Sequence, residues 1–261
     1  MKKKLSFLQA LRTLLFYLLL SCSVLMWGIV CLVVFLFIPY AWLMRGFIQP
    51  WCRFVVGLAR IVVGLRYNIT GLENLPKNAC VIVSKHQSTW ETIFFTGLIY
   101  PISNVLKREL QFIPFFGWML ALSRQVAINR GTPKEAFKQL LDKGSKLLKE
   151  GHYIVIFPEG TRTLPGQNGR FSRGGITLAA TAGVEAIPVA HNAGEFWPKK
   201  GWAKFPGTIE VVFGEPIKPQ GNDAESITQA NKAAEMWIVT TMQGITSPIF
   251  LEKEETTLSK S

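Results

Sequence analysis

The chain contains an uninterrupted run of 32 residues, positions 13–44, in which no side chain is charged. As one straight helix this run would measure about 48 Å, whereas the hydrocarbon core of a bilayer is about 30 Å thick. It must therefore tilt strongly, bend or fold back. Three lysines precede it, as in a signal peptide. The run is far longer than the apolar region of a signal peptide, however, and we predict that it is retained.

Both ends of this run are basic, with Arg12 on one side and Arg45 on the other. A single crossing would place one basic end on the unfavoured side of the membrane, because cytoplasmic ends carry the excess of Lys and Arg. A hairpin or re-entrant pair, with Pro39 near its second end, would leave both basic ends on the cytoplasmic side.

Residues 47–65 predict an amphipathic helix, because Arg53 and Arg60 lie seven positions apart among apolar side chains. Such a helix can lie at the membrane interface with its arginines toward the lipid headgroups. The alternative is a surface helix of a globular domain, which also has one apolar and one polar face.

The positive charge is concentrated in the same part of the chain. Residues 1–72 contain eight Lys or Arg and no Asp or Glu, in a chain of net charge +12. Because this surplus is attached to apolar sequence, it favours anionic membrane lipid over nucleic acid as a partner. The four cysteines lie in or beside apolar runs and form no Cys-x2-Cys pair, which disfavours a metal site. Free cysteines also indicate a reducing, cytoplasmic setting for the soluble part.

Short β-branched runs alternate with helical patterns over the rest of the chain. We expect strands at 80–83, 125–131, 153–157, 187–190 and 208–214, and helices at 133–149 and 223–245. This alternation predicts an α/β fold. We divide the chain into membrane-embedded and interfacial helices (1–66), an α/β domain (67–251) and a polar tail (252–261).

A histidine and a carboxylate, His86 and Glu91, lie where the strand at 80–83 ends and a helix begins. Histidine titrates near neutral pH, and a carboxylate within reach can fix its tautomer and stabilise its protonated form, so the pair is a candidate general base. On one continuous helix the two side chains would point about 140° apart. His86 must therefore lie in the loop, with Glu91 one turn into the helix. The alternative is that His86 caps the helix and Glu91 is a solvated charge.

A second polar turn follows the strand at 153–157 and contains Glu159, Gly160, Thr161 and Arg162. Turns at strand ends often carry the ligand-binding groups of α/β proteins. Arg162 can bind a phosphate through two N–H groups, and backbone N–H groups and the Thr161 hydroxyl can add donors. The alternative is an ordinary turn with solvated arginines.

Four ordered blocks within residues 68–216 resemble those of the glycerolipid acyltransferase family, and in particular of the members that acylate 1-acyl-sn-glycerol-3-phosphate. The blocks are Lys85-His86-x4-Glu91, Lys107-Arg108-Glu109-Leu110 with Ile113-Pro114-x2-Gly117, Phe157-Pro158-Glu159-Gly160-Thr161-Arg162, and Ile187-Pro188-Val189. The family usually has Asp where this chain has Glu91. It also often has Asp before the arginine of its second block, where this chain has Asn129 before Arg130.

The resemblance implies an α/β fold of the glycerolphosphate acyltransferase type, with a mixed, largely parallel sheet flanked by helices and preceded by N-terminal membrane helices. It implies that His86 removes the proton from the sn-2 hydroxyl of lysophosphatidic acid, and that Glu91 orients the imidazole and stabilises the imidazolium. The residues implied to bind the acceptor are Lys107, Arg130, Glu159, Gly160, Thr161 and Arg162. No metal and no cofactor is implied, and the co-substrate is an acyl-acyl carrier protein (acyl-ACP) or acyl-CoA.

The expected function on this resemblance is acyl transfer to lysophosphatidic acid, giving phosphatidic acid in phospholipid biosynthesis. The expected location is the bacterial inner membrane, with the catalytic domain on the cytoplasmic face. Two other functions are left open. One is a same-fold acyltransferase that uses glycerol-3-phosphate or another lysophospholipid as its acceptor. The other is a non-enzymatic, membrane-anchored protein that binds anionic lipid.

Overall fold

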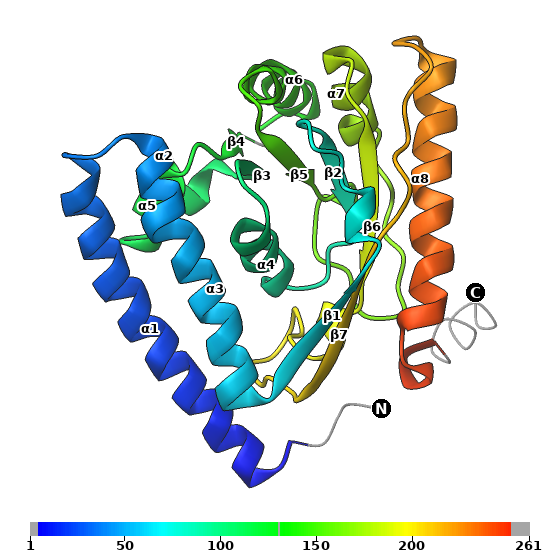
Figure 1. Ribbon diagram of the computed structural model, residues 1–261. Helices are drawn as coiled ribbons and strands as arrows, with labels where there is room; N and C mark the ends of the chain where they lie inside the picture. Colours follow the sequence, from blue (N-terminus) through cyan, green and yellow to red (C-terminus); the bar gives the residue numbers. More distant parts are fainter. Residues whose placement is uncertain (1–4, 130, 252–261) are drawn as a thin grey trace.

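The computed structural model describes residues 5–129 and 131–251. Its centre is a seven-stranded sheet with helices on both faces (Figure 1). The strands lie in the order β1-β7-β6-β2-β5-β3-β4. Their bounds are β1 (Leu65–Thr70), β2 (Val81–Ser84), β3 (Ile102–Lys107), β4 (Val126–Ile128), β5 (Tyr153–Ile156), β6 (Ala186–His191) and β7 (Gly207–Phe213).

Neighbouring strands run parallel except for β6 and β7, which are antiparallel. The predicted mixed, largely parallel sheet is therefore confirmed. The central strands β2, β5 and β6 are buried along their whole length, in keeping with their largely apolar sequences. Because β2, β5, β3 and β4 run in the same direction, their carboxyl ends meet at one edge of the sheet.

Helices form a layer on each face of the sheet (Figure 1). The helices of one face are α6 (Pro133–Lys149), α7 (Gly174–Ala182) and α8 (Ala224–Ile245), which share a core with β2, β5 and β6. On the other face lies α4 (Trp90–Leu98), and α1 (Phe7–Phe35) and α5 (Phe116–Leu122) lie further out. The helices predicted at 133–149 and 223–245 are confirmed by α6 and α8.

The uncharged run at 13–44 folds back between Phe35, where α1 ends, and Tyr40, where a return helix begins. Pro39 therefore lies at the turn of this helical pair, not near its second end as predicted. α1 is one continuous helix, and Pro39 is the capping residue that starts the return helix. A proline is favoured at a helix start because its missing N–H group is not needed there. The return helix comprises α2 (Tyr40–Leu43), a π-helical turn (Met44–Ile48), α3 (Gln49–Leu58) and a second π-helical turn (Ala59–Val63).

The apolar face of the return helix packs against the protein. Trp51 and Val55 are buried, and the indole N–H of Trp51 donates to Ser23 Oγ of α1 over 3.2 Å. Arg53 Nε donates to the carbonyl of Gly97 in α4 over 2.8 Å. The segment predicted as an interfacial helix is therefore the second arm of the helical pair, and its apolar face is covered by the domain.

The outer side of α1 is exposed although it is apolar. Its exposed side chains include Leu8, Leu11, Leu14, Leu18, Leu25, Met26, Ile29 and Val33. Both α1 and the helix over Tyr40–Val63 are long and apolar enough to cross a membrane, by length and composition. Contiguous exposed apolar surface marks contact with a membrane or a partner. The two helices thus suggest membrane association.

Candidate active site

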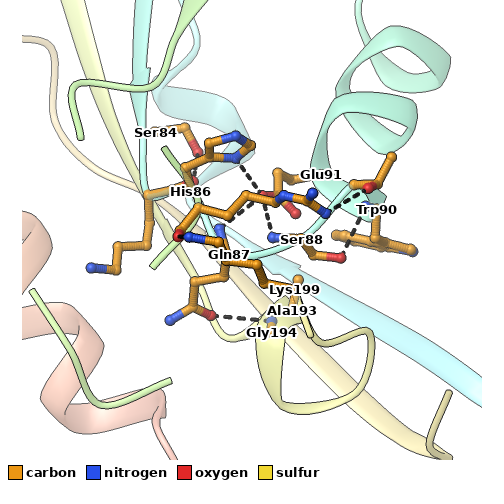
Figure 2. A network of polar contacts seen from close by, with 12 residues as sticks. Ser84, His86, Gln87, Ser88, Trp90, Glu91, Ala193, Gly194 and Lys199 are labelled. Atoms are coloured by element: carbon orange, nitrogen blue, oxygen red, sulfur yellow. Dashed lines mark hydrogen bonds and ion pairs between the residues drawn. The ribbon is translucent and has the colours of Figure 1, made fainter. Parts of the chain in front are cut away.

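His86 and Glu91 are in direct contact at the carboxyl end of β2. His86 lies in the loop between β2 and α4, and Glu91 lies in the first turn of α4. His86 Nδ1 is 2.9 Å from Glu91 Oε1 (Figure 2). The sequence reasoning required this arrangement, because the two side chains would diverge on a single helix. The extra methylene of Glu relative to Asp does not prevent the contact.

Glu91 is fully buried and is held by the loop that carries His86. Its Oε1 accepts hydrogen bonds from the backbone N–H groups of Gln87 (2.9 Å) and Ser88 (2.7 Å). Burial alone would raise the pKa of Glu91. The protonated forms of the neighbouring His191 and His86, with the hydrogen bonds from His86 and Ser88, outweigh that effect and lower the pKa. Glu91 is therefore a carboxylate at neutral pH.

The imidazole of His86 is positioned by an aromatic ring as well. It stacks on Phe157, with ring centroids 4.0 Å apart and an interplanar angle of 17°. Its side chain is 19% exposed, whereas that of Glu91 is 0% exposed. Figure 2 shows the second ring nitrogen, Nε2, pointing away from Glu91. The imidazole therefore has one nitrogen on the buried carboxylate and the other available to a substrate.

The backbone of His86 is tied to the turn that follows β5. Its N–H donates to Glu159 Oε2 over 2.9 Å, and its carbonyl accepts from Thr163 N–H over 2.8 Å. The other oxygen of Glu159 pairs with Lys85 Nζ at 2.5 Å, and these two side chains are 3% (Lys85) and 1% (Glu159) exposed. Glu159 thus holds the loop of His86 from inside the protein.

The turn after β5 carries the predicted phosphate-binding residues. Gly160 has a φ of 67°, a conformation that favours glycine, and its N–H donates to the carbonyl of Phe157 over 3.0 Å. The guanidinium of Arg162 donates to Thr89 Oγ1 over 3.1 Å, just before α4 begins. Thr161 Oγ1 accepts from Lys199 Nζ over 3.4 Å. Thr161 and Arg162 therefore lie beside the loop of His86.

Two further predicted residues come from the neighbouring strands. Lys107 is the exposed last residue of β3, at the edge of the sheet where β2 and β5 also end. Arg130, which follows β4, lies outside the described residues, so its predicted role stays a prediction. The topology explains why blocks far apart in the sequence face one edge of the sheet.

Several residues that support the site were not predicted as site residues. Lys85 precedes His86 within the first block, and its pairing with Glu159 becomes visible once β2 and β5 are known to be neighbours. Lys199 lies in a loop after β6 that has no recognisable pattern around it. The stacking of Phe157 on His86 depends on side-chain geometry that spacing does not encode.

His191, at the end of β6, is a further buried residue that the sequence reasoning missed. Its Nε2 donates to the carbonyl of Lys85 over 2.7 Å, and its Nδ1 accepts from Ala193 N–H over 3.4 Å. Burial lowers the pKa of His191, so its imidazole is neutral at physiological pH and fits this pair of roles. His191 thus supports the residue that precedes His86.

Comparisons with known proteins find relatives over most of the chain. The Acyltransferase family model matches residues 66–192. A 1-acyl-sn-glycerol-3-phosphate acyltransferase of Pseudomonas aeruginosa is 52% identical over 244 residues, which cover 94% of this chain and 95% of that protein. A chloroplastic 1-acyl-sn-glycerol-3-phosphate acyltransferase of Brassica napus is 32% identical over 64% of this chain and 50% of its own length.

A solved structure shares the fold along nearly the whole chain. The crystal structure of a 1-acyl-sn-glycerophosphate acyltransferase, PlsC, from Thermotoga maritima superposes with a TM-score of 0.75. The superposed region covers 90% of this chain and 95% of the Thermotoga maritima chain, and the sequence identity is 22%. With the relative from Pseudomonas aeruginosa matching from end to end, the chain belongs to the family of 1-acyl-sn-glycerol-3-phosphate acyltransferases.

Proposed function

We propose that this chain transfers an acyl group from an acyl thioester to the sn-2 hydroxyl of lysophosphatidic acid, giving phosphatidic acid, and that His86 is the general base. The observation that carries the assignment of His86 is its contact with Glu91. A histidine can act as a general base when a carboxylate contacts one ring nitrogen and a substrate can reach the other. In His86 the buried carboxylate of Glu91 contacts Nδ1, and the side chain remains partly exposed.

The hydrogen bond to Glu91 selects the tautomer of His86. The Glu91 carboxylate accepts hydrogen bonds and donates none, so the neutral imidazole carries its proton on Nδ1. Nε2 then has the free lone pair and can accept the proton of a substrate hydroxyl. When it does so, the negative charge of Glu91 stabilises the imidazolium.

The reaction then follows with atoms and charges balanced. The sn-2 oxygen loses its proton to Nε2 of His86 and forms a bond with the carbonyl carbon of the thioester. The tetrahedral intermediate collapses with cleavage of the carbon–sulfur bond, and the leaving thiolate takes the proton back from the imidazolium. The products are phosphatidic acid and the free carrier thiol.

The phosphate of the acceptor fits the basic groups at the same edge of the sheet. Arg162 offers a planar set of N–H donors beside Thr89, and Thr161 contributes a hydroxyl from the same turn. Lys107 adds a positive charge at the end of β3, and Arg130 is assigned the same role from the sequence. Substitution of Arg162 by Ala should raise the KM for lysophosphatidic acid more than that for the acyl donor.

The exposed apolar side of α1 supports a membrane location for this chemistry. Lysophosphatidic acid and phosphatidic acid both reside in the bilayer, so an enzyme attached to the membrane surface receives its acceptor laterally. We propose the inner membrane of a bacterium, with the catalytic domain on the cytoplasmic face and anionic lipid around the basic helical pair. The donor is acyl-ACP or acyl-CoA, since both carry the thioester that the reaction needs.

Thiol release by purified enzyme tests the proposal directly. We would measure it with acyl-CoA and with acyl-ACP, using lysophosphatidic acid, glycerol-3-phosphate and a lysophospholipid with a headgroup as separate acceptors. Release that depends on lysophosphatidic acid and is lost in His86→Ala supports the proposal. Faster release with another acceptor would assign the enzyme to that acceptor. Lipid binding without thiol release from either donor would identify a lipid-binding protein.

A further inference from the structure

We propose that Lys199 is a positioning residue for the phosphate of the acceptor, because it holds the backbone of the Thr161–Arg162 turn, whereas Thr89 contacts the Arg162 guanidinium. This inference rests on the proposed function of Arg162 as a phosphate ligand. Lys199 lies in the loop that joins β6 to β7, outside the four blocks that resemble the family.

Arg162 is held at both ends by different parts of the chain. Lys199 Nζ donates to the backbone carbonyl of Arg162 over 2.5 Å and contacts Thr161 Oγ1 at 3.4 Å. The guanidinium of Arg162 donates to Thr89 Oγ1 over 3.1 Å. A flexible arginine loses side-chain entropy when it binds phosphate, and anchors at both ends reduce that loss.

Lys199 is suited to this task because its loop is itself anchored. The loop is closed at its base by a hydrogen bond of 2.8 Å from Phe205 N–H to the carbonyl of Phe196. Within the same loop Lys204 is buried, and its Nζ donates to the hydroxyl of Tyr17 in α1 over 2.7 Å. The loop therefore bridges α1 and the phosphate-binding turn.

The backbone of Lys204 strengthens the same attachment. Its carbonyl accepts from Gln9 Nε2 over 2.8 Å, and its N–H donates to Thr13 Oγ1 over 3.2 Å. Gln9 and Thr13 both belong to α1 and are buried. Since α1 is packed on the domain, it gives the loop a rigid support, and Lys199 can hold the carbonyl of Arg162 in one place.

Loss of Lys199 should weaken binding of the acceptor and leave the chemical step nearly intact. A hydrogen bond from a charged group is lost from the turn, whereas the contact between His86 and Glu91 does not involve Lys199. We expect Lys199→Ala to raise the KM for lysophosphatidic acid by about tenfold. The kcat and the KM for the acyl donor should stay within about twofold of wild type.

The adjacent Lys200 provides a matched control. Lys200 is exposed, and the structure shows for it no hydrogen bond or ion pair with another described residue. Lys200→Ala removes the same charge from the same loop, so it reports any general electrostatic effect on the anionic substrate. Lys199→Arg keeps a cationic donor and should restore part of the affinity.

A double-mutant cycle tests whether Lys199 acts through Arg162. We would measure the KM for lysophosphatidic acid in Lys199→Ala, Arg162→Ala and the double variant. If Lys199 positions Arg162, its loss should have little further effect once the Arg162 side chain is absent. Additive effects would show that Lys199 acts independently of that side chain, and would overturn the proposal.

The same measurements separate this inference from the proposed function. If wild type does not acylate lysophosphatidic acid, or if Arg162→Ala leaves its KM unchanged, the proposed function of Arg162 fails. If wild type and Arg162→Ala behave as proposed, but Lys199→Ala changes the KM for lysophosphatidic acid no more than Lys200→Ala does, then only the role of Lys199 is wrong. A fall in kcat with unchanged KM in Lys199→Ala would also overturn it.

Discussion

His86 Nδ1 lies 2.9 Å from Glu91 Oε1, and that same oxygen accepts two backbone N–H groups of the loop that carries His86. One carboxylate oxygen thus determines both the tautomer of the imidazole and the path of the backbone beside it. The other oxygen, Oε2, is buried and has no hydrogen-bond partner among the described residues. All the hydrogen bonds that Glu91 accepts from described residues therefore come from the loop of His86.

Substitution of His86 by Ala should remove acyl transfer while leaving the protein folded and membrane-bound. A positioned general base contributes about 10²- to 10⁴-fold to a rate, and no other described residue occupies the position of Nε2. Thiol release with lysophosphatidic acid measures the loss. The thermal unfolding midpoint in detergent serves as the control. Activity within about tenfold of wild type would exclude His86 as the base.

Glu91 should make stability depend on pH in a defined window. Its pKa is lowered in the folded protein relative to the ordinary value of 4.5, so the folded state favours the ionised form. The resulting stabilisation is fully present above that ordinary pKa and is lost as the pH falls through the lowered one. Glu91→Gln has no group to ionise and lacks this dependence.

Thermal unfolding of wild type and Glu91→Gln between about pH 3 and about pH 7 measures this effect. The difference in midpoint should be constant at the upper end of the range and should shrink at its acidic end. Glu91→Gln also keeps an oxygen that can accept from Gln87 and Ser88, which limits other changes. A difference that grows toward acidic pH would mean that the pKa of Glu91 is raised.

Lys85→Met should destabilise the protein and reduce its activity. The substitution leaves the buried carboxylate of Glu159 without its cation, at a cost on the order of 3–5 kcal/mol in the free energy of unfolding. Glu159 also accepts from the backbone N–H of His86, so the loop of His86 should shift. Chemical unfolding and thiol release measure the two effects.

The double variant Lys85→Met with Glu159→Gln is the control for that prediction. It removes both charges and retains an oxygen that can accept from His86. It should recover much of the stability that Lys85→Met alone loses. If the double variant were less stable than Lys85→Met, the buried charge of Glu159 would not be the cause of the destabilisation.

Gly117→Ala should destabilise the packing of α5 against the segment that joins it to β3. A Cβ at this position would lie 2.6 Å from the carbonyl oxygens of Leu110 and Gln111, closer than real Cβ contacts allow. We expect a loss of about 1–3 kcal/mol, visible as a lower thermal midpoint. Gly57→Ala in α3 is the matched control, since a Cβ there meets no atom within 4 Å. An equal effect of the two substitutions would contradict the steric reason.

Much of the fold follows from local sequence. The apolar β-branched runs define β2 and β5, and the Thr132 cap with Pro133 marks the start of α6, because these signals act within a few residues. The position of the turn in the helical pair was not predicted: Pro39 was expected near the second end of the hairpin and lies at its turn. Uniformly apolar sequence does not show where a helix ends, and Pro39 is compatible with either side of a turn.

The contact between His86 and Glu91 could also be predicted from the sequence. The spacing of His86 and Glu91 allowed a contact only across a loop and a first helical turn, and that contact exists. Lys199 and Phe157 could not be assigned a role in the same way. Their contacts join segments far apart in the chain, and they depend on strand order and on side-chain geometry that spacing does not contain.

The stacking of His86 on Phe157, together with the bonds from its N–H and carbonyl to the neighbouring turn, has a consequence for turnover. The entropy of ordering the base is lost once, when the chain folds, and is not lost again in each catalytic cycle. Hydrogen exchange at the His86 amide should accordingly be as slow as in the adjacent strand. In the proposed reaction the lipid is then the partner that moves, and it brings its hydroxyl to a nitrogen that the fold already holds in place.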